Sequence, residues 1–400
     1  MEQSAQFAVP FPVDENKLLE VLQNLIRINS VNPYLAKDGP GERELADYIH
    51  RMLESMGLDV QVQPLTDKAV NVIGIWKGTG GGRSLLLNGH MDTVGISNMQ
   101  IDPLSPDTRD GNVYGRGSCD MKGSLAAMIL AVDTLKQAGQ RLAGDVILTF
   151  VADEEFKSIG TEALVKAFTA DAAIVCEPSD LKAMIAHKGF AWITVEVKGI
   201  AAHGSRPKEG IDAIVKAGKL LAALEPLSHE LEKKTHPILG APSIHASIIS
   251  GGTELSTYPA SCRIELERRT IPGETAADIE REMDVLLRHL HKTDETFQAT
   301  YEITFVREPF EIAADESIVR ALTRAYANQT GEAQSISGFS GWADSSILHA
   351  SGVPTVIFGP RGAGLHGAVE YVEFDSLVKM TSILAEVINE FCKPRTEIQS

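Results

Sequence analysis

The feature of this sequence that most constrains its fold is a set of apolar segments that each run into a histidine or an acidic residue. Three such segments lead, in chain order, to His90, to Asp153 and to Glu177. Short apolar runs of this kind are typical of strands that are buried on both faces of a parallel sheet. Open α/β sheets bind their ligands at the carboxyl ends of the strands. The sequence therefore predicts an α/β fold with its polar chemistry at one sheet edge.

The first of these strand ends combines two side chains that metal sites use together. His90 follows the run Leu85-Leu86-Leu87, and Asp92 comes two positions later. On a strand, residues two positions apart share a face, so the Asp92 carboxylate can accept the proton of one His90 ring nitrogen. The other nitrogen is then free for a metal ion. An isolated His-x-Asp pair is more often an ordinary hydrogen-bonded pair, so this reading depends on further ligands.

Further acidic residues and a second histidine are expected at the same edge. They are Asp120 in a glycine-rich turn, Glu154 and Glu155 after the second strand, Glu177 after the third, and His366 in the loop after residues 353–358. Each one alone could be a helix cap, a solvated turn or a surface residue. Together, the carboxylates would repel one another unless cations neutralised them. Two zinc ions would balance three carboxylate ligands and a bridging hydroxide, and a histidine and carboxylate ligand set without cysteine suits zinc or cobalt.

These motifs, in this order, resemble those of the di-zinc aminoacyl deacylases and exopeptidases. That family includes acetylornithine deacetylase, succinyl-diaminopimelate desuccinylase, aminoacylase and carboxypeptidase G. The resemblance covers nearly the whole chain and rests on Gly89-His90-Met91-Asp92-Thr93-Val94, Gly115-Arg116-Gly117, Asp120-Met121-Lys122-Gly123, Asp153-Glu154-Glu155, Glu177-Pro178 and the loop from Gly359 to His366.

The resemblance implies a role for each residue at the predicted edge. Its implied ligand set is His90 and Glu177 for one zinc ion, Glu155 and His366 for the other, and Asp120 as the bridge. It also implies that Glu154 is the general base and that the peptide bond after Asp120 is cis. Zinc lowers the pKa of bound water to about 7, and a nearby carboxylate can carry the proton from that water to the leaving group.

The implied reaction is hydrolysis of the amide bond of a small N-acyl amino acid, and acetylornithine deacetylase-like activity is the first expectation. Desuccinylase, aminoacylase, carboxypeptidase or dipeptidase activity is the alternative within the same class, with a dipeptide as the alternative substrate. A non-catalytic binding protein on the same fold is the alternative from a different class. The intact Glu154 and the complete ligand set argue against that last possibility.

A second pattern begins near residue 188. Strands are predicted over 190–197, 243–249, 262–267 and 297–306, and helices over 211–224 and 274–291. The resulting order, β-α-β-β-α-β, is ferredoxin-like. Because this region lies between Glu177 and His366, we expect a domain of residues 188–306 inserted into a discontinuous metal-binding domain of residues 1–187 and 307–400. The resemblance implies that the inserted domain is a lid that also joins a homodimer.

The resemblance also implies substrate contacts in the inserted domain. His203 matches a histidine that reaches the partner subunit's active site and stabilises the tetrahedral oxyanion. Without the resemblance it would be an ordinary exposed loop histidine. Arg269 matches an arginine that holds the substrate carboxylate, a task that suits its planar guanidinium, and Arg268 is the alternative. Ser256 stands where the family usually has asparagine, which puts one polar contact in doubt.

Three residues of a later polar segment complete the predicted site. The segment that contains Gly338 and Ser340 is expected to wrap around the substrate. Asp344 is expected either to cap a helix or to contact the residues that form the site, without contacting the substrate itself. A glycine-rich run at residues 78–82 lacks the Lys-Ser/Thr ending of a phosphate-binding loop. We expect it to be a hairpin turn between two strands.

Composition excludes several other classes of function. The net charge of −17 over 400 residues argues against binding to nucleic acid or to an anionic membrane surface. No run approaches the roughly 18 apolar residues of a membrane span, and the first residues lack the pattern of a signal peptide. The scattered residues Cys119, Cys176, Cys262 and Cys392 are typical of reduced thiols. We therefore expect a cytoplasmic enzyme.

Overall fold

The computed structural model describes residues 11–395, which form two compact units. Unit 1 contains residues 11–185, 312–337 and 343–395, and unit 2 contains residues 186–311 and 338–342. Compared with the predicted bounds of 188–306, residues 186–187, 307–311 and 338–342 also group with the inserted region. The Trp342 ring packs edge-on against Phe190 with the ring centroids 6.3 Å apart, and the Trp342 indole nitrogen donates a hydrogen bond to the Glu308 carbonyl.

Unit 1 has the predicted α/β fold and is built on a large mixed sheet. From one edge inwards, its strands are β1 (Asp59–Pro64), β2 (Val70–Trp76), β6 (Val146–Val151), β3 (Leu85–His90), β7 (Ala172–Val175), β15 (Thr355–Ile357) and β8 (Ala183–His187). The short strands β13 (Phe310–Glu311) and β14 (Ile336–Phe339) pair with β8. Strands β6, β3, β7 and β15 run parallel, and all of their residues are buried. The predicted apolar strands therefore end at the same edge of the sheet.

The glycine-rich run at residues 78–82 is not a hairpin, and this prediction was wrong. Strand β6 lies between β2 and β3, so the two strands joined by the run do not pair. The run instead bonds to the segment that leads into β6: Thr79 and Gly80 donate backbone hydrogen bonds to the carbonyls of Leu142 and Ala143. Turn residues indicate that the chain reverses direction, but they do not show whether the two strands that they join pair with each other or with a third strand between them.

The helices of unit 1 are α1 (Glu15–Arg27), α2 (Arg43–Ser55), α3 (Gly123–Gln137), α4 (Ile159–Leu164), α7 (Ser317–Thr330), α8 (Ser345–Ala350) and α9 (Phe374–Phe391). Asp14 caps the start of α1, because its carboxylate accepts a hydrogen bond from the Lys17 backbone nitrogen at 3.0 Å. Gly57, with φ of +74°, follows α2. Helix α3 is buried from Gly123 to Leu135, with α1 and α9 as neighbours and strands β3 and β6 behind it.

Two smaller elements of unit 1 carry chemistry. The turn η1 (Ser118–Lys122) precedes α3 and contains Asp120. A small antiparallel sheet is formed by β16 (Gly362–Ala363), β17 (Tyr371–Glu373), β5 (Asn112–Tyr114) and β4 (Asp107–Arg109), and His366 lies between β16 and β17. Among the described residues, no helix has the length and the apolar character that a membrane span requires.

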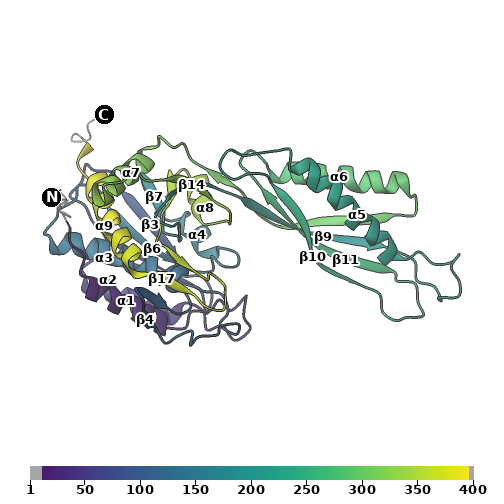
Figure 1. Cartoon of the computed structure of the whole chain (residues 1–400), viewed down its shortest axis with the longest axis horizontal. Helices are drawn as coiled ribbons and strands as arrows, with labels where there is room; N and C mark the ends of the chain where they lie inside the picture. The colour runs from purple at the N-terminus through teal and green to yellow at the C-terminus, as the bar shows by residue number, and fades with distance from the viewer. Residues whose placement is uncertain (1–10, 396–400) are drawn as a thin grey trace, which may run out of the picture. The chain divides into compact units, whose positions relative to one another are not determined.

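Unit 2 has the predicted order of elements, namely β9 (Gly189–Lys198), α5 (Ala213–Leu231), β10 (Ser243–Gly251), β11 (Ser261–Thr270), α6 (Ala276–Thr293) and β12 (Gln298–Arg307). Its antiparallel sheet has the order β10-β11-β9-β12, and α5 and α6 cover one face of it (Figure 1). Helix α5 continues through Pro226, beyond its predicted end. The buried Leu224 and Leu231 pack into the apolar core of the unit and extend the helix.

Candidate active site

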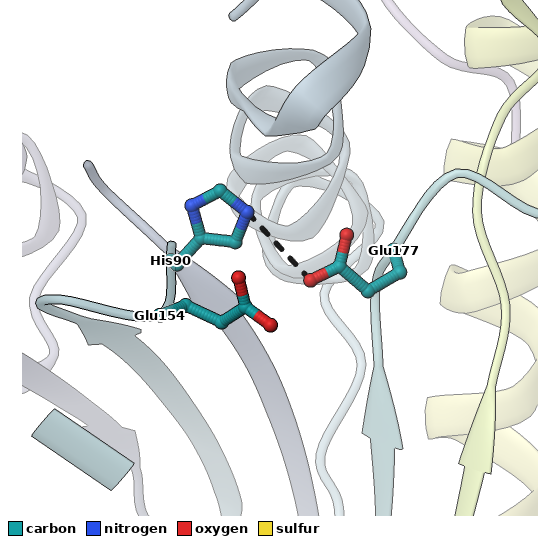
Figure 2. A group of neighbouring side chains, drawn as sticks. All are labelled: His90, Glu154 and Glu177. Atoms are coloured by element: carbon teal, nitrogen blue, oxygen red, sulfur yellow. Dashed lines mark ion pairs between the residues drawn. The ribbon is translucent and has the colours of Figure 1, made fainter. Parts of the chain in front are cut away.

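The structure brings the six residues predicted to carry the chemistry together in unit 1. His90 ends β3, Asp120 lies in η1, Glu154 and Glu155 follow β6, Glu177 follows β7, and His366 lies in the loop between β16 and β17. Figure 2 shows that His90, Glu154 and Glu177 point toward one another from separate segments of the chain. The predicted cis peptide bond between Asp120 and Met121 is present.

Asp120 stands between two histidine–glutamate pairs. Its Oδ1 lies 3.1 Å from the His90 Nε2 atom, and its Oδ2 lies 3.3 Å from the His366 Nε2 atom. The His90 Nε2 atom is also 3.6 Å from Glu177 Oε1, and the His366 Nε2 atom is 3.1 Å from Glu155 Oε2. The two oxygens of one carboxylate therefore face two different half-sites, each made of one imidazole and one glutamate.

The charges of these groups act on one another at short range. Burial raises the pKa of Glu177 to about 8, and the neighbouring Asp120 and Glu155 charges add to this shift. Burial would also raise the pKa of Asp120, but hydrogen bonds from His366 and His90 hold it below its ordinary value. Hydrogen bonds to Asp120 and Glu155 raise the pKa of His366 to about 10. The carboxylates thus need neighbouring positive charge to stay ionised. The imidazole and carboxylate groups of this site are the ligand types that divalent cations bind.

Within residues 11–395, two groups of donor atoms are close enough to hold a metal ion, and both contain His90. One group is His90, Glu154 and Glu177, and the other is His90, Asp120 and Glu155; within each group the atoms lie within 4.8 Å of one another. Geometry alone therefore allows Glu154 to be a ligand as well as a base. Burial holds the pKa of its carboxyl well above the ordinary value, and the charge of Glu177 adds to the shift.

Asp92 faces His90, as expected, and it also makes contacts that were not expected. Strand β3 ends at His90, so Asp92 lies beyond the strand. The His90 Nδ1 atom is 2.9 Å from the Asp92 carbonyl oxygen and 3.5 Å from its carboxylate. The carboxylate also accepts hydrogen bonds from the backbone nitrogens of Glu154 and Glu155, at 3.1 and 3.2 Å. Asp92 therefore joins the turn after β3 to the turn after β6.

Two supporting residues were missed by the sequence analysis. The buried Asn32 side chain donates from its Nδ2 atom to Asp92 at 2.8 Å and to Asp153 at 2.9 Å. The buried Glu370 accepts hydrogen bonds from the Arg116 guanidinium at 2.7 Å and from the Asp120 backbone nitrogen at 3.0 Å. Each bond joins positions far apart in the chain, so no local pattern indicates it.

Asp344 matches the second of its two predicted roles. It directly precedes α8, but its side chain makes no capping hydrogen bond. Its carboxylate is buried and accepts a hydrogen bond from the Thr161 hydroxyl at 2.6 Å, which connects it to α4, the helix that follows the Glu154–Glu155 turn.

The predicted substrate contacts belong to unit 2 and stay predictions. The exposed His203 hydrogen bonds to the Ser205 hydroxyl at 2.8 Å, and the Arg269 Nε donates to Glu267 at 2.7 Å. Gly338 is half-buried and Ser340 is exposed. Arg268, the alternative carboxylate clamp, is 1% exposed and its guanidinium bonds to Glu274 and Glu282, so we exclude it.

Comparison with known proteins gives consistent matches. The model of peptidase family M20/M25/M40 matches residues 86–390. The acetylornithine deacetylase of Myxococcus xanthus is 30% identical, over 88% of this chain and 93% of that protein. The N-formyl-4-amino-5-aminomethyl-2-methylpyrimidine deformylase of Halalkalibacterium halodurans is 29% identical, over 96% of each chain.

The fold is also that of a solved structure. The YxeP protein of Bacillus subtilis, described as a dinuclear metal-binding peptidase of the M20 family, superposes with a TM-score of 0.69 at 16% identity, over 95% of this chain and 99% of that one. The family model spans most of the chain, and the curated relatives align over nearly their whole length. The chain therefore belongs to peptidase family M20/M25/M40 and is a metal-dependent amidohydrolase.

Proposed function

We propose that this enzyme removes the acyl group from a small N-acyl amino acid, as an acetylornithine deacetylase does, with two zinc ions and with Glu154 as the general base. The observation that carries the proposal is the position of Asp120, whose two oxygens face His90 and His366 separately. His90 and Glu177 would hold one ion, His366 and Glu155 the other, and Asp120 would bridge them. Cobalt, which accepts the same ligand types, would substitute for zinc.

The chain's own residues supply the proton transfers of this reaction. When bound, zinc provides a water of lowered pKa and polarises the substrate carbonyl. Glu154 takes the proton of the attacking water as the new C–O bond forms, and it delivers that proton to the nitrogen as the C–N bond breaks. Asp92 accepts hydrogen bonds from the backbone of Glu154 and Glu155, which holds the base in a fixed position. The products are a carboxylate and an amine.

A substrate panel tests this proposal. Metal-loaded enzyme is assayed with N-acetyl, N-formyl and N-succinyl amino acids and with dipeptides, and we expect the highest kcat/KM for an N-acetyl amino acid with a free carboxylate. The similarity to the Myxococcus xanthus acetylornithine deacetylase supports an N-acetyl substrate. The similarity to the deformylase is the reason to include N-formyl substrates in the panel. A higher kcat/KM for an N-formyl, N-succinyl or dipeptide substrate would overturn the substrate assignment. Loss of all amide hydrolysis would favour the non-catalytic alternative.

We also propose a cytoplasmic location for this reaction. All four cysteines of the chain are free and buried in the structure: Cys119, Cys176, Cys262 and Cys392. Disulfides form in oxidising compartments and are rare in the cytosol. Unpaired buried thiols therefore support a reducing environment.

We further propose that unit 2 joins two copies of the chain into a homodimer. Strand β10 is at the edge of its sheet, and it exposes Ile248 to 62% and Ile249 to 50%. The first turn of α5 exposes Val215 to 61%. An edge strand with exposed apolar side chains is a template for pairing with another chain, and identical chains pair most often about a two-fold axis. In such a dimer, the partner's His203 would complete the oxyanion site.

Complementation between two inactive variants tests the dimer. We expect His203→Ala and Glu154→Gln to be inactive alone and to regain activity when mixed. A heterodimer has one site that lacks both groups and one intact site, and about half of the dimers formed at random are heterodimers. Adding Ile249→Lys to both variants is the control, because a charge on the edge strand should prevent pairing. Without recovery after confirmed subunit exchange, His203 would not act in the partner's site.

A further inference from the structure

Three buried carboxylates lie behind the Glu154–Glu155 turn, and the proposed proton transfers use none of them. Glu42, Asp92 and Asp153 have exposed fractions of 1%, 0% and 1%. The Asp92 carboxylate lies 3.5 Å from the His90 Nδ1 atom, whereas the hydrogen bonds that Asp153 and Glu42 accept from Asn32 and from the Asp153 backbone come from neutral amide groups. Three neighbouring negative charges would be costly to bury in these surroundings, so the protonation of this cluster requires a physical explanation.

The hydrogen-bond donors around the cluster are shared unequally. Asp92 accepts from Asn32 and from the backbone nitrogens of Glu154 and Glu155. Asp153 accepts from the second hydrogen of the same Asn32 amide, at 2.9 Å. The Glu42 side chain accepts from the Asp153 backbone nitrogen at 3.3 Å. Burial raises the pKa of Asp153 as well, but Asp153 accepts its bond at the shorter distance, and the backbone nitrogens of Ile159 and Lys157 also favour its ionised form. Glu42 is therefore the natural site for a proton.

Two buried oxygens of the cluster have no partner, and they belong to adjacent residues in this network. They are Glu42 Oε2 and Asp153 Oδ2. A single proton on Glu42 would satisfy both oxygens, because its O–H group would donate and the Asp153 carboxylate would accept. Burial raises the pKa of Glu42 to about 8, and the charges of Asp92 and Asp153, the two titratable groups that face it, add to this shift.

We propose that Glu42 is held as a neutral carboxylic acid that donates a hydrogen bond to Asp153, and that it thereby positions the general base. Asp153 bonds to Asn32, Asn32 bonds to Asp92, and Asp92 holds the backbone of Glu154 and Glu155. Glu42 is therefore a positioning residue that touches neither substrate nor metal. The link to catalysis rests on the proposed function of Glu154, whereas the protonation of Glu42 does not.

Two substitutions separate hydrogen bonding from simple filling of space. Glu42→Gln keeps an acceptor for the Asp153 nitrogen and a donor for its carboxylate, so we expect kcat and KM close to those of the wild type. Glu42→Leu fills a similar volume but cannot donate, and we expect kcat to fall by about 10- to 100-fold, the usual effect of losing an outer partner of a metal site, with KM unchanged. Glu44→Leu, at an exposed position in the first turn of α2, the helix that Glu42 precedes, is the matched control.

The pH dependence of stability tests the proton itself, and it needs no substrate. The Glu42 pKa lies above its unfolded value of 4.5, so the folded state keeps a proton that the unfolded state has lost. Wild-type stability should therefore decline as the pH rises toward the folded value, and the Gln variant should lack this contribution. We expect the Tm of Glu42→Gln to rise relative to that of the wild type between about pH 5 and about pH 8, and the two curves to run parallel at higher pH.

The outcomes distinguish this inference from the proposed function. Parallel curves of Tm against pH for the wild type and Glu42→Gln would show that Glu42 is ionised, and they would overturn the inference. A water molecule that donates to both Glu42 Oε2 and Asp153 Oδ2 would give that result. Loss of kcat in Glu42→Gln equal to that in Glu42→Leu would overturn the positioning role. If no substrate of the panel were hydrolysed, the proposed function would fail while the comparison of Tm curves still decided the state of Glu42.

Discussion

Replacing Glu154 by glutamine should lower kcat by about 100- to 10,000-fold, the range that a positioned general base contributes, and should leave both metal ions bound. Glutamine fills the same space but cannot accept the proton of the attacking water. The measurement is kcat on the best substrate of the panel, together with the metal content of the purified variant. The backbone of residue 154 stays held by Asp92, so the fold of the turn should not change.

Glu155→Gln is the matched control, because it changes the neighbouring residue in the same way. The Glu155 carboxylate lies 3.1 Å from the His366 Nε2 atom, so its neutralisation should weaken one metal position. The comparison is needed because Glu154 also lies within reach of a metal ion, in a group with His90 and Glu177. Equal metal loss in the two variants would show that Glu154 is a ligand and that the base lies elsewhere.

Asp120→Asn should have the largest effect on metal binding, because both half-sites share this carboxylate. We expect the affinity for both ions to fall by more than the 10- to 100-fold that is typical of outer partners, and we expect amide hydrolysis to be lost. Metal affinity is measured by calorimetric titration after circular dichroism has confirmed the fold. Glu177→Gln is the comparison, since it should weaken the His90 position alone. Retention of one ion at full affinity in Asp120→Asn would show that Asp120 does not bridge.

Much of the site could be predicted because buried parallel strands have a strong signature in sequence. The strands that deliver His90, Glu154 and Glu177 are buried and mainly apolar, and a histidine or an acidic residue lies at the end of each strand or within two positions after it. Such strands must end at the same edge of the sheet when they run parallel. The inserted unit was predictable for a similar reason, because strand and helix periods alternate clearly along it.

The remaining contacts depend on pairings that local sequence does not contain. Strand β6 separates β2 from β3, and strand order is a property of the whole sheet. Arg116 and Glu370 are 254 positions apart, and Asn32 reaches both Asp92 and Asp153 across the fold. Asp92 contacts His90 as expected, but the bonds that it accepts from the Glu154 and Glu155 backbone join two separate turns and could not be predicted.

The residues of unit 2 show a different limit. The sequence around His203 and Arg269 is that of an ordinary loop and an ordinary strand, and their proposed roles come from family resemblance. The structure did decide between the two neighbouring arginines, because Arg268 is buried among carboxylates and Arg269 remains partly exposed. Side-chain direction on a strand alternates, and that alternation assigns one of two adjacent residues to the core.

Zinc titration of the chelator-treated enzyme, with activity and bound metal measured on the same samples, tests the central claim most directly. The metal-free protein should not hydrolyse the amide substrate, and either zinc or cobalt should restore the reaction. Binding should saturate near two ions per chain, as the shared Asp120 requires, and activity should follow occupancy. Full amide hydrolysis by metal-free protein would contradict the account.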